Sequence, residues 1–170
     1  STNSGCGTAS SATGPFYCPA DQSAYFDTTF FDSLSNYGAH NAPFAQMYIV
    51  AHEFGHHIQQ LEGTLQLSDY NDPGADSNAV KIELQADCYA GIWASHADKG
   101  KDALLEPISQ QQVADAVTAA QAVGDDNIQR RSTGQVQPDA WTHGSSEQRQ
   151  RAFLAGYNSG RMAECDTLGR

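Results

Sequence analysis

Hydrophobic residues recur at three- and four-residue intervals along residues 43–61, which is the spacing of an amphipathic helix. The positions on this apolar face are Phe44, Met47, Tyr48, Ala51, Phe54 or Gly55, Ile58 and Leu61. Pro43 suits the first turn of the helix, and Gly63 suits its end. Inside a helix, a glycine such as Gly55 costs roughly 1 kcal/mol relative to alanine. We therefore expect another backbone to approach this helix closely at Gly55.

Further periodic stretches predict an α+β fold that is mostly helical. Helices are expected at residues 28–37, 77–98, 109–124 and 145–157. The last two begin with the capping-box patterns Ser109-x-x-Gln112 and Ser145-x-x-Gln148. Two short strands with a turn between them, a β-hairpin, are expected at residues 15–18 and 23–27. Irregular structure is expected at residues 1–14 and 125–142.

Composition and charge narrow the class of protein. Twenty acidic residues against nine basic ones give a net charge of −11, which disfavours nucleic acids and anionic membrane surfaces as partners. A chain of 170 residues fits a single domain, 1–170, and contains no run near the ~18 apolar residues of a membrane span. Because the chain begins at Ser1 without an initiator methionine, we expect a mature or trimmed product, and the sequence leaves open whether a signal, anchor or pro-segment preceded it.

Four cysteines, which are widely spaced, indicate the redox environment. They are Cys6, Cys18, Cys88 and Cys165, and no two of them form a C-x-x-C pair. A cysteine zinc site or a redox motif is therefore disfavoured. An even number of cysteines in a secreted protein favours two disulfides, with three pairings possible, and the alternative is buried free thiols.

The strongest chemical motif, His52-Glu53-x-x-His56, lies inside the first predicted helix. Residues four apart share one face of a helix, so the two imidazoles can hold one zinc ion. Glu53 lies one step round the helix, where it can accept a proton from a zinc-bound water whose pKa falls towards about 7. His57 points about 100° away from His56 and cannot join this face. The alternative is an amphipathic helix whose histidines are ordinary surface or core residues.

A third ligand is expected from Glu83-x-x-x-Asp87, on the next predicted helix. One carboxylate can bind zinc while the other accepts the far N–H of a ligand histidine, which fixes the orientation of that imidazole. We assign Glu83 to the metal and Asp87 to the hydrogen bond. One alternative is an aspzincin-like site in which Asp87 is the ligand, and another is two solvated acids. Acidic residues in the loop 63–76 could hold calcium, but a solvated loop is favoured.

A zinc peptidase also needs a donor for the negative oxygen that develops on the attacked carbonyl. His143, which lies just before the helix at residues 145–157, is the predicted donor, and Tyr157 is the second candidate. Alternatively, His143 supports the local turn. The predicted N-terminal hairpin either offers a strand edge to a substrate peptide or only covers the core.

The combination of His52-Glu53-x-x-His56 with Glu83-x-x-x-Asp87 resembles the gluzincin metallopeptidases, the group that includes thermolysin. The chain is also similar to the bacterial neutral zinc metallopeptidase family over residues 4–27, 50–59, 83–94, 124–129, 142–157 and 165–167. This resemblance implies an exported protein with zinc ligands His52, His56 and Glu83 and a base at Glu53. Thermolysin is far longer, so no specificity pocket is inferred from this resemblance.

We therefore predict a small, zincin-like, bacterial domain with an N-terminal β-hairpin and one zinc ion between two core helices. The expected protein is secreted or extracytoplasmic, monomeric, and hydrolyses peptide bonds in peptide or protein substrates. Its disulfides are predicted to be Cys6–Cys18 and Cys88–Cys165, the second of which ties the helix of Glu83 to the C-terminus. The rival hypothesis is a zinc-stabilised extracellular binding module with little or no turnover.

Overall fold

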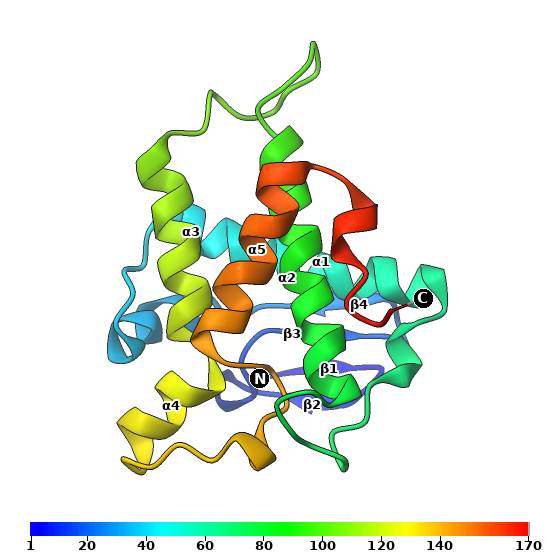
Figure 1. The fold of residues 1–170 in the computed structure, drawn as a ribbon, viewed down its shortest axis with the longest axis vertical. Coiled ribbons are helices and arrows are strands. Elements are labelled where there is room, and N and C mark those ends of the chain that lie inside the picture. The colour runs from blue at the N-terminus through cyan, green and yellow to red at the C-terminus, as the bar shows by residue number, and fades with distance from the viewer. Residues whose placement is uncertain (170) are drawn as a thin grey trace.

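In the computed structural model, which describes residues 1–169, five α-helices and two small β-hairpins carry the fold (Figure 1). The strands are β1 (Thr2–Ser4), β2 (Gly7–Ala9), β3 (Phe16–Cys18) and β4 (Ser23–Tyr25). The α-helices are α1 (Pro43–Glu62), α2 (Asn78–His96), α3 (Gln110–Ala122), α4 (Asp125–Ser132) and α5 (Ser146–Ser159). The 3₁₀ helices are η1 (Ser11–Thr13), η2 (Thr28–Tyr37), η3 (Leu65–Leu67), η4 (Pro138–Ala140) and η5 (Met162–Cys165). The predicted class, α+β and mostly helical, is confirmed.

Two stretches that were expected to be irregular, residues 1–14 and 125–142, contain regular secondary structure, so that expectation was wrong. The first contains the antiparallel hairpin β1–β2, whose strands are mostly exposed and therefore show no alternation of apolar and polar residues. The second contains α4, which has few apolar residues. Its acids lie in the first turn and its arginines in the last turn, an arrangement that stabilises a helix through its dipole.

The predicted hairpin is present, and side chains cap three of the α-helices. Strands β3 and β4 pair antiparallel, with Phe16 opposite Tyr25. The side chain of Ser77 accepts a hydrogen bond from the backbone N–H of Val80 at the start of α2. Capping boxes begin both α3 and α5, where the sequence predicted them.

Glycines allow α2 to pack closely against two other helices. A Cβ atom at Gly55 of α1 would lie 3.0 Å from the Cα atom of Ala86 in α2, which explains a glycine inside α1. A Cβ atom at Gly91 of α2 would lie 2.0 Å from the carbonyl oxygen of Phe153 in α5. In Figure 1, α2, α3 and α5 run side by side and α1 crosses behind them. Helix α2 therefore packs between α1 and α5, and this packing brings polar side chains of the three helices close together.

Both cysteine pairs are bonded as predicted. Cys6 is joined to Cys18, which links the hairpin β1–β2 to strand β3. Cys88 of α2 is joined to Cys165 of η5, with sulfur atoms 1.99 Å apart. Within residues 1–169, no helix has both the length and the apolar character needed to cross a bilayer.

Candidate metal centre

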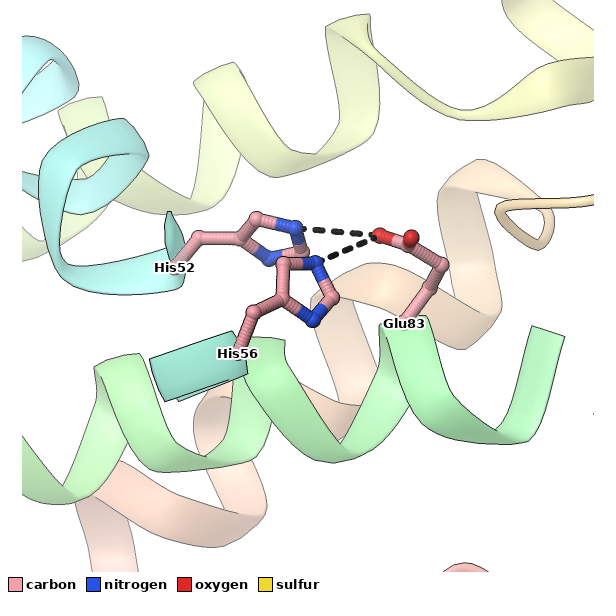
Figure 2. A group of neighbouring side chains, drawn as sticks. All are labelled: His52, His56 and Glu83. Carbon is pink, nitrogen blue, oxygen red and sulfur yellow. Dashed lines mark hydrogen bonds and ion pairs between the residues drawn. The ribbon is translucent and has the colours of Figure 1, made fainter. Parts of the chain in front are cut away.

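Three potential ligands from two helices meet in the interior of the protein (Figure 2). The Nε2 atoms of His52 and His56 lie 3.0 Å and 3.4 Å from Oε2 of Glu83. One ligand atom from each residue can be chosen so that all three lie within 4.8 Å of one another, and all three residues are buried. Donors of a tetrahedral zinc site, each about 2.0–2.2 Å from the metal, lie roughly 3.3 Å apart. The donor set and its spacing therefore fit a zinc ion.

Asp87 lies behind His52 and accepts hydrogen bonds from three other side chains. Its Oδ1 atom lies 2.8 Å from Nδ1 of His52 and 2.5 Å from the hydroxyl of Tyr48. Arg149 of α5 donates through Nε to Oδ2 at 2.8 Å and through Nη2 to Oδ1 at 3.1 Å. Burial opposes ionisation, but Arg149 and His52 lower the pKa of Asp87 to about 2. Asp87 is therefore a carboxylate at neutral pH.

The geometry supports Glu83 rather than Asp87 as the third ligand. Asp87 contacts Nδ1 of His52, whereas Glu83 faces Nε2, the nitrogen on the same side as Nε2 of His56. Burial opposes protonation of His52, but the negative charges of Asp87 and Glu83 raise its pKa to about 10. Because both nitrogens of His52 are occupied by carboxylates, the imidazole is fixed in orientation.

Glu83 is oriented by a tyrosine that the sequence analysis missed. The hydroxyl of Tyr70, in the loop before α2, donates to Oε1 of Glu83 at 2.7 Å. Burial would raise the pKa of Glu83, but His56 and His143 lower it well below its usual value. With Oε1 bound by Tyr70, Oε2 is left facing the two imidazoles.

Glu53 and the histidine pair line a cleft of about 690 Å³. Glu53 is buried, and burial raises the pKa of its carboxyl group. Strand β3 borders the same cleft through Phe16 and Tyr17, and His143 and Tyr70 border it as well. Strand β3 and Glu53 therefore border one and the same cleft.

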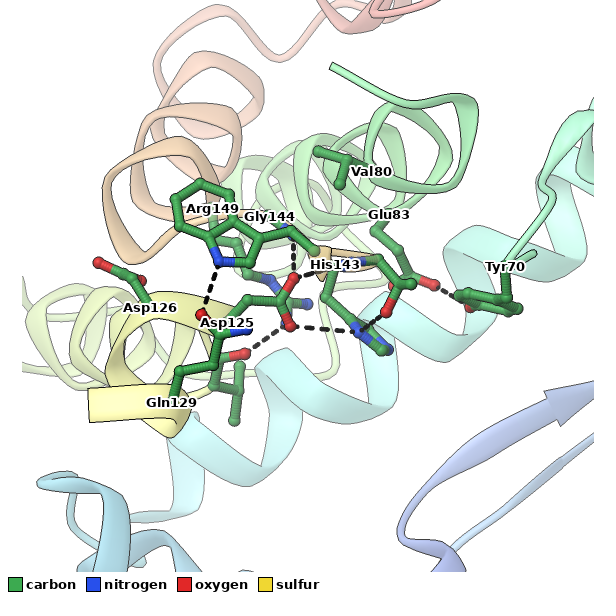
Figure 3. Close-up of polar contacts among 12 residues, drawn as sticks. Tyr70, Val80, Glu83, Asp125, Asp126, Gln129, His143, Gly144 and Arg149 are labelled. Carbon is green, nitrogen blue, oxygen red and sulfur yellow. Dashed lines mark hydrogen bonds and ion pairs between the residues drawn. The ribbon is translucent and has the colours of Figure 1, made fainter. Parts of the chain in front are cut away.

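His143 lies at the cleft in a loop that Asp125 holds (Figure 3). Oδ2 of Asp125 accepts the backbone N–H groups of Thr142, His143 and Gly144 at 3.0, 2.8 and 2.9 Å. Burial opposes protonation of His143, but Asp125 and Glu83 raise the pKa of its ring. Its ring lies 5.9 Å from that of Tyr70, and it is not part of the metal-ligand group among residues 1–169.

The other residues that the sequence analysis considered for the site are not part of the metal-ligand group in the described part of the chain. The ring of Tyr157 stacks on Phe153, and Tyr157 is not among the residues that line the cleft in the described part of the chain. Nδ1 of His57 lies 2.8 Å from the hydroxyl of Tyr17, away from the ligand face. The metal-capable cluster found in residues 1–169 contains no acidic residue of the loop 63–76.

Several functional neighbours were missed although the sequence carried signals for them. Tyr48 precedes His52 by four residues, and Gln59 follows His56 by three, so both share the ligand face of α1. Arg149 precedes the buried Phe153 by four residues, which places a charge on the core face of α5. No sequence signal pointed to Tyr70, because loop geometry alone brings it to Glu83.

Comparison with known proteins adds a family and several relatives. A family model described as "Putative neutral zinc metallopeptidase" matches residues 1–168. The uncharacterized protein Rv2575 of Mycobacterium tuberculosis is 51% identical over 170 residues, which cover 96% of this chain and 58% of that protein. The uncharacterized protein YpfJ of Escherichia coli K12 is 42% identical over 174 residues, 99% of this chain and 59% of that protein. The chain thus spans less than two thirds of these relatives, and no solved structure matches it.

Proposed function

This chain belongs to the neutral zinc metallopeptidase family, and we propose that it is a zinc-dependent endopeptidase of the gluzincin type. The proposal holds that His52, His56 and Glu83 bind one zinc ion. The observation that carries it is the convergence of these three donors beside Glu53 in one cleft. Each donor has its second polar atom engaged by a neighbour, which is the usual support of a metal site in proteins.

Bound zinc would supply a coordinated water with a pKa near about 7 and would polarise the substrate carbonyl. Glu53 would accept the proton of that water as it attacks the peptide carbonyl, and would then pass the proton to the leaving amine. Its position in the same cleft, one residue from His52, supports this role.

We assign the oxyanion donor to His143 and the substrate edge to β3. Asp125 holds three consecutive backbone N–H groups around His143, so the imidazole is carried by a fixed loop rather than a free one. Strand β3 pairs with β4 on one side and borders the cleft, which supports substrate binding by strand addition. Two disulfides support an extracytoplasmic location.

Glu53→Gln tests the proposal. Glutamine preserves the shape of the side chain but cannot take up the proton, so the variant should keep zinc and fold while losing nearly all casein hydrolysis. Glu106→Gln, an exposed change of the same chemistry, is the matched control and should hydrolyse casein at the wild-type rate. Wild-type hydrolysis should stop with a chelator and return with zinc.

The outcomes separate the rival hypotheses. Zinc binding by the wild type without chelator-sensitive hydrolysis would favour the zinc-stabilised binding module. Substantial hydrolysis by Glu53→Gln at neutral pH would exclude Glu53 as the base while leaving the peptidase assignment in place.

A further inference from the structure

We propose that Gln59 is a positioning residue that fixes the tautomer of His56 for zinc binding, and that Gln85 and the backbone of Cys165 hold Gln59 in place. This inference rests on the proposed zinc function and extends it to two glutamines that lie outside the ligand set. The juxtaposition that carries it is a continuous series of hydrogen bonds from His56 through Gln59 and Gln85 to the C-terminal segment.

The direction of each hydrogen bond in the series follows from two backbone carbonyls. Nε2 of Gln59 lies 2.8 Å from the carbonyl oxygen of Ile82, which can only accept, so this end of Gln59 must be the amide N–H₂. The oxygen of Gln59 then faces His56, with Oε1 lying 2.8 Å from Nδ1. An amide oxygen can only accept, so Nδ1 of His56 carries the proton.

This tautomer is the one that a metal site requires. With the proton on Nδ1, the lone pair of Nε2 in His56 is free, and Nε2 is the atom that faces Oε2 of Glu83. Histidine ligands in metal sites are commonly fixed in this way by an acceptor on the far nitrogen. Gln59 would thus do for His56 what Asp87 does for His52, but without adding a charge.

Gln85 fixes the second half of the series. Its Nε2 atom donates to the carbonyl oxygen of Cys165 at 2.9 Å, so its Oε1 atom is the one that accepts from Nε2 of Gln59, also at 2.9 Å. If either amide were flipped, two oxygens would face each other at hydrogen-bond distance. The orientation of both glutamines is therefore set by the backbone carbonyls of Ile82 and Cys165.

Burial stabilises the orientation of the Gln59 and Gln85 side-chain amides. Gln59 is 0% exposed and Gln85 is 6% exposed, so bulk water does not compete for their amides. The segment that carries Cys165 is itself held against α2, by the disulfide to Cys88 and by a 2.6 Å hydrogen bond from Thr167 to the carbonyl of Lys81. The C-terminal segment is thereby connected to a proposed metal ligand that lies more than a hundred residues earlier in the chain.

Gln59→Met and Gln85→Met test the inference, with Gln121→Met as the matched control. Gln121 also donates to a glutamine, Gln150, but between α3 and α5 and away from the metal site. Zinc affinity is measured by competition with a chromophoric chelator. NMR of zinc-loaded protein labelled with ¹⁵N-histidine reports whether the N–H of His56 resists exchange with solvent.

Gln59→Met should weaken zinc affinity about 10–100-fold, the usual range for loss of such a partner, and should speed exchange of the His56 N–H. Gln85→Met should weaken zinc affinity about 10-fold and speed exchange of the His56 N–H to a smaller extent, because Gln59 keeps its contact with His56 but loses the acceptor Oε1 of Gln85. Gln121→Met should leave both quantities at wild-type values.

The inference is overturned if Gln59→Met lowers only the melting temperature while zinc affinity and exchange protection stay at wild-type values, since Gln59 would then be merely structural. If Gln59→Met does not fold, Gln85→Met decides by the same two readouts. Wild-type protein that binds no zinc would overturn the proposed function and this inference together. Wild-type zinc binding with unchanged affinity in both variants would overturn the inference alone.

Discussion

Arg149→Met should strongly destabilise the protein, because it removes the arginine that pairs with the buried carboxylate of Asp87 through two hydrogen bonds. Asp87 is 0% exposed and Arg149 is 4% exposed, and two hydrogen bonds of 2.8 and 3.1 Å join them. Methionine keeps most of the apolar volume of the arginine stem, so the lost charge dominates the change.

The magnitude follows from the partners that remain. Removing one member of a buried ion pair typically costs 3–5 kcal/mol. Asp87 keeps two donors, Tyr48 and His52, so we expect the lower end, about 3 kcal/mol. The double variant Asp87→Asn with Arg149→Met removes the buried carboxylate together with its arginine, and it should be more stable than Arg149→Met alone by about 1–3 kcal/mol.

Urea unfolding at pH 7 in the presence of a chelator measures these differences without the stabilisation that bound zinc would add. Arg151→Met is the matched control, since Arg151 lies on the same helix and pairs with Glu147 at the surface, where ion pairs contribute little. The reasoning is refuted if Arg149→Met unfolds at the same urea concentration as Arg151→Met, or if the double variant is less stable than Arg149→Met.

Three further predictions concern the site. Glu83→Ala should lose most bound zinc in metal analysis, while Asp87→Ala should keep the site and bind zinc about 10–100-fold more weakly; the reverse order would make Asp87 the ligand. His143→Ala should lower kcat about 10²–10³-fold with KM and melting temperature little changed, whereas a lower melting temperature with normal kcat would assign His143 to the turn. Because the folded-state pKa of Asp87 is lowered to about 2, its contribution is complete above the unfolded pKa of about 4 and is lost as pH falls towards 2. Urea unfolding at pH 5 and pH 3 should therefore differ more in the wild type than in the double variant.

Local signals in the sequence were sufficient for four of the five α-helices, the hairpin β3–β4 and half of the site. Capping boxes depend on residues three apart, so Ser109 and Ser145 marked helix starts that the structure contains. The four-residue spacing of His52 and His56 fixes their common face for any regular helix. Gly55 indicated a close helix contact before its partner was known. Helix α4 and hairpin β1–β2 were not predicted, because neither buries an apolar face that would give a periodic pattern in the sequence.

Only the tertiary structure determined which faces of the helices lie against one another. Spacing along one helix shows which residues share a face, but it does not show which face of another helix lies opposite, since that depends on packing across long separations. The close contact of Gly55 with Ala86 brings Glu83 to the two histidines, and the contact of Gly91 with α5 brings Arg149 to Asp87. Tyr70 reaches Glu83 through a loop without a periodic pattern, and Gln85 reaches the carbonyl of Cys165, a backbone atom that no side-chain motif records.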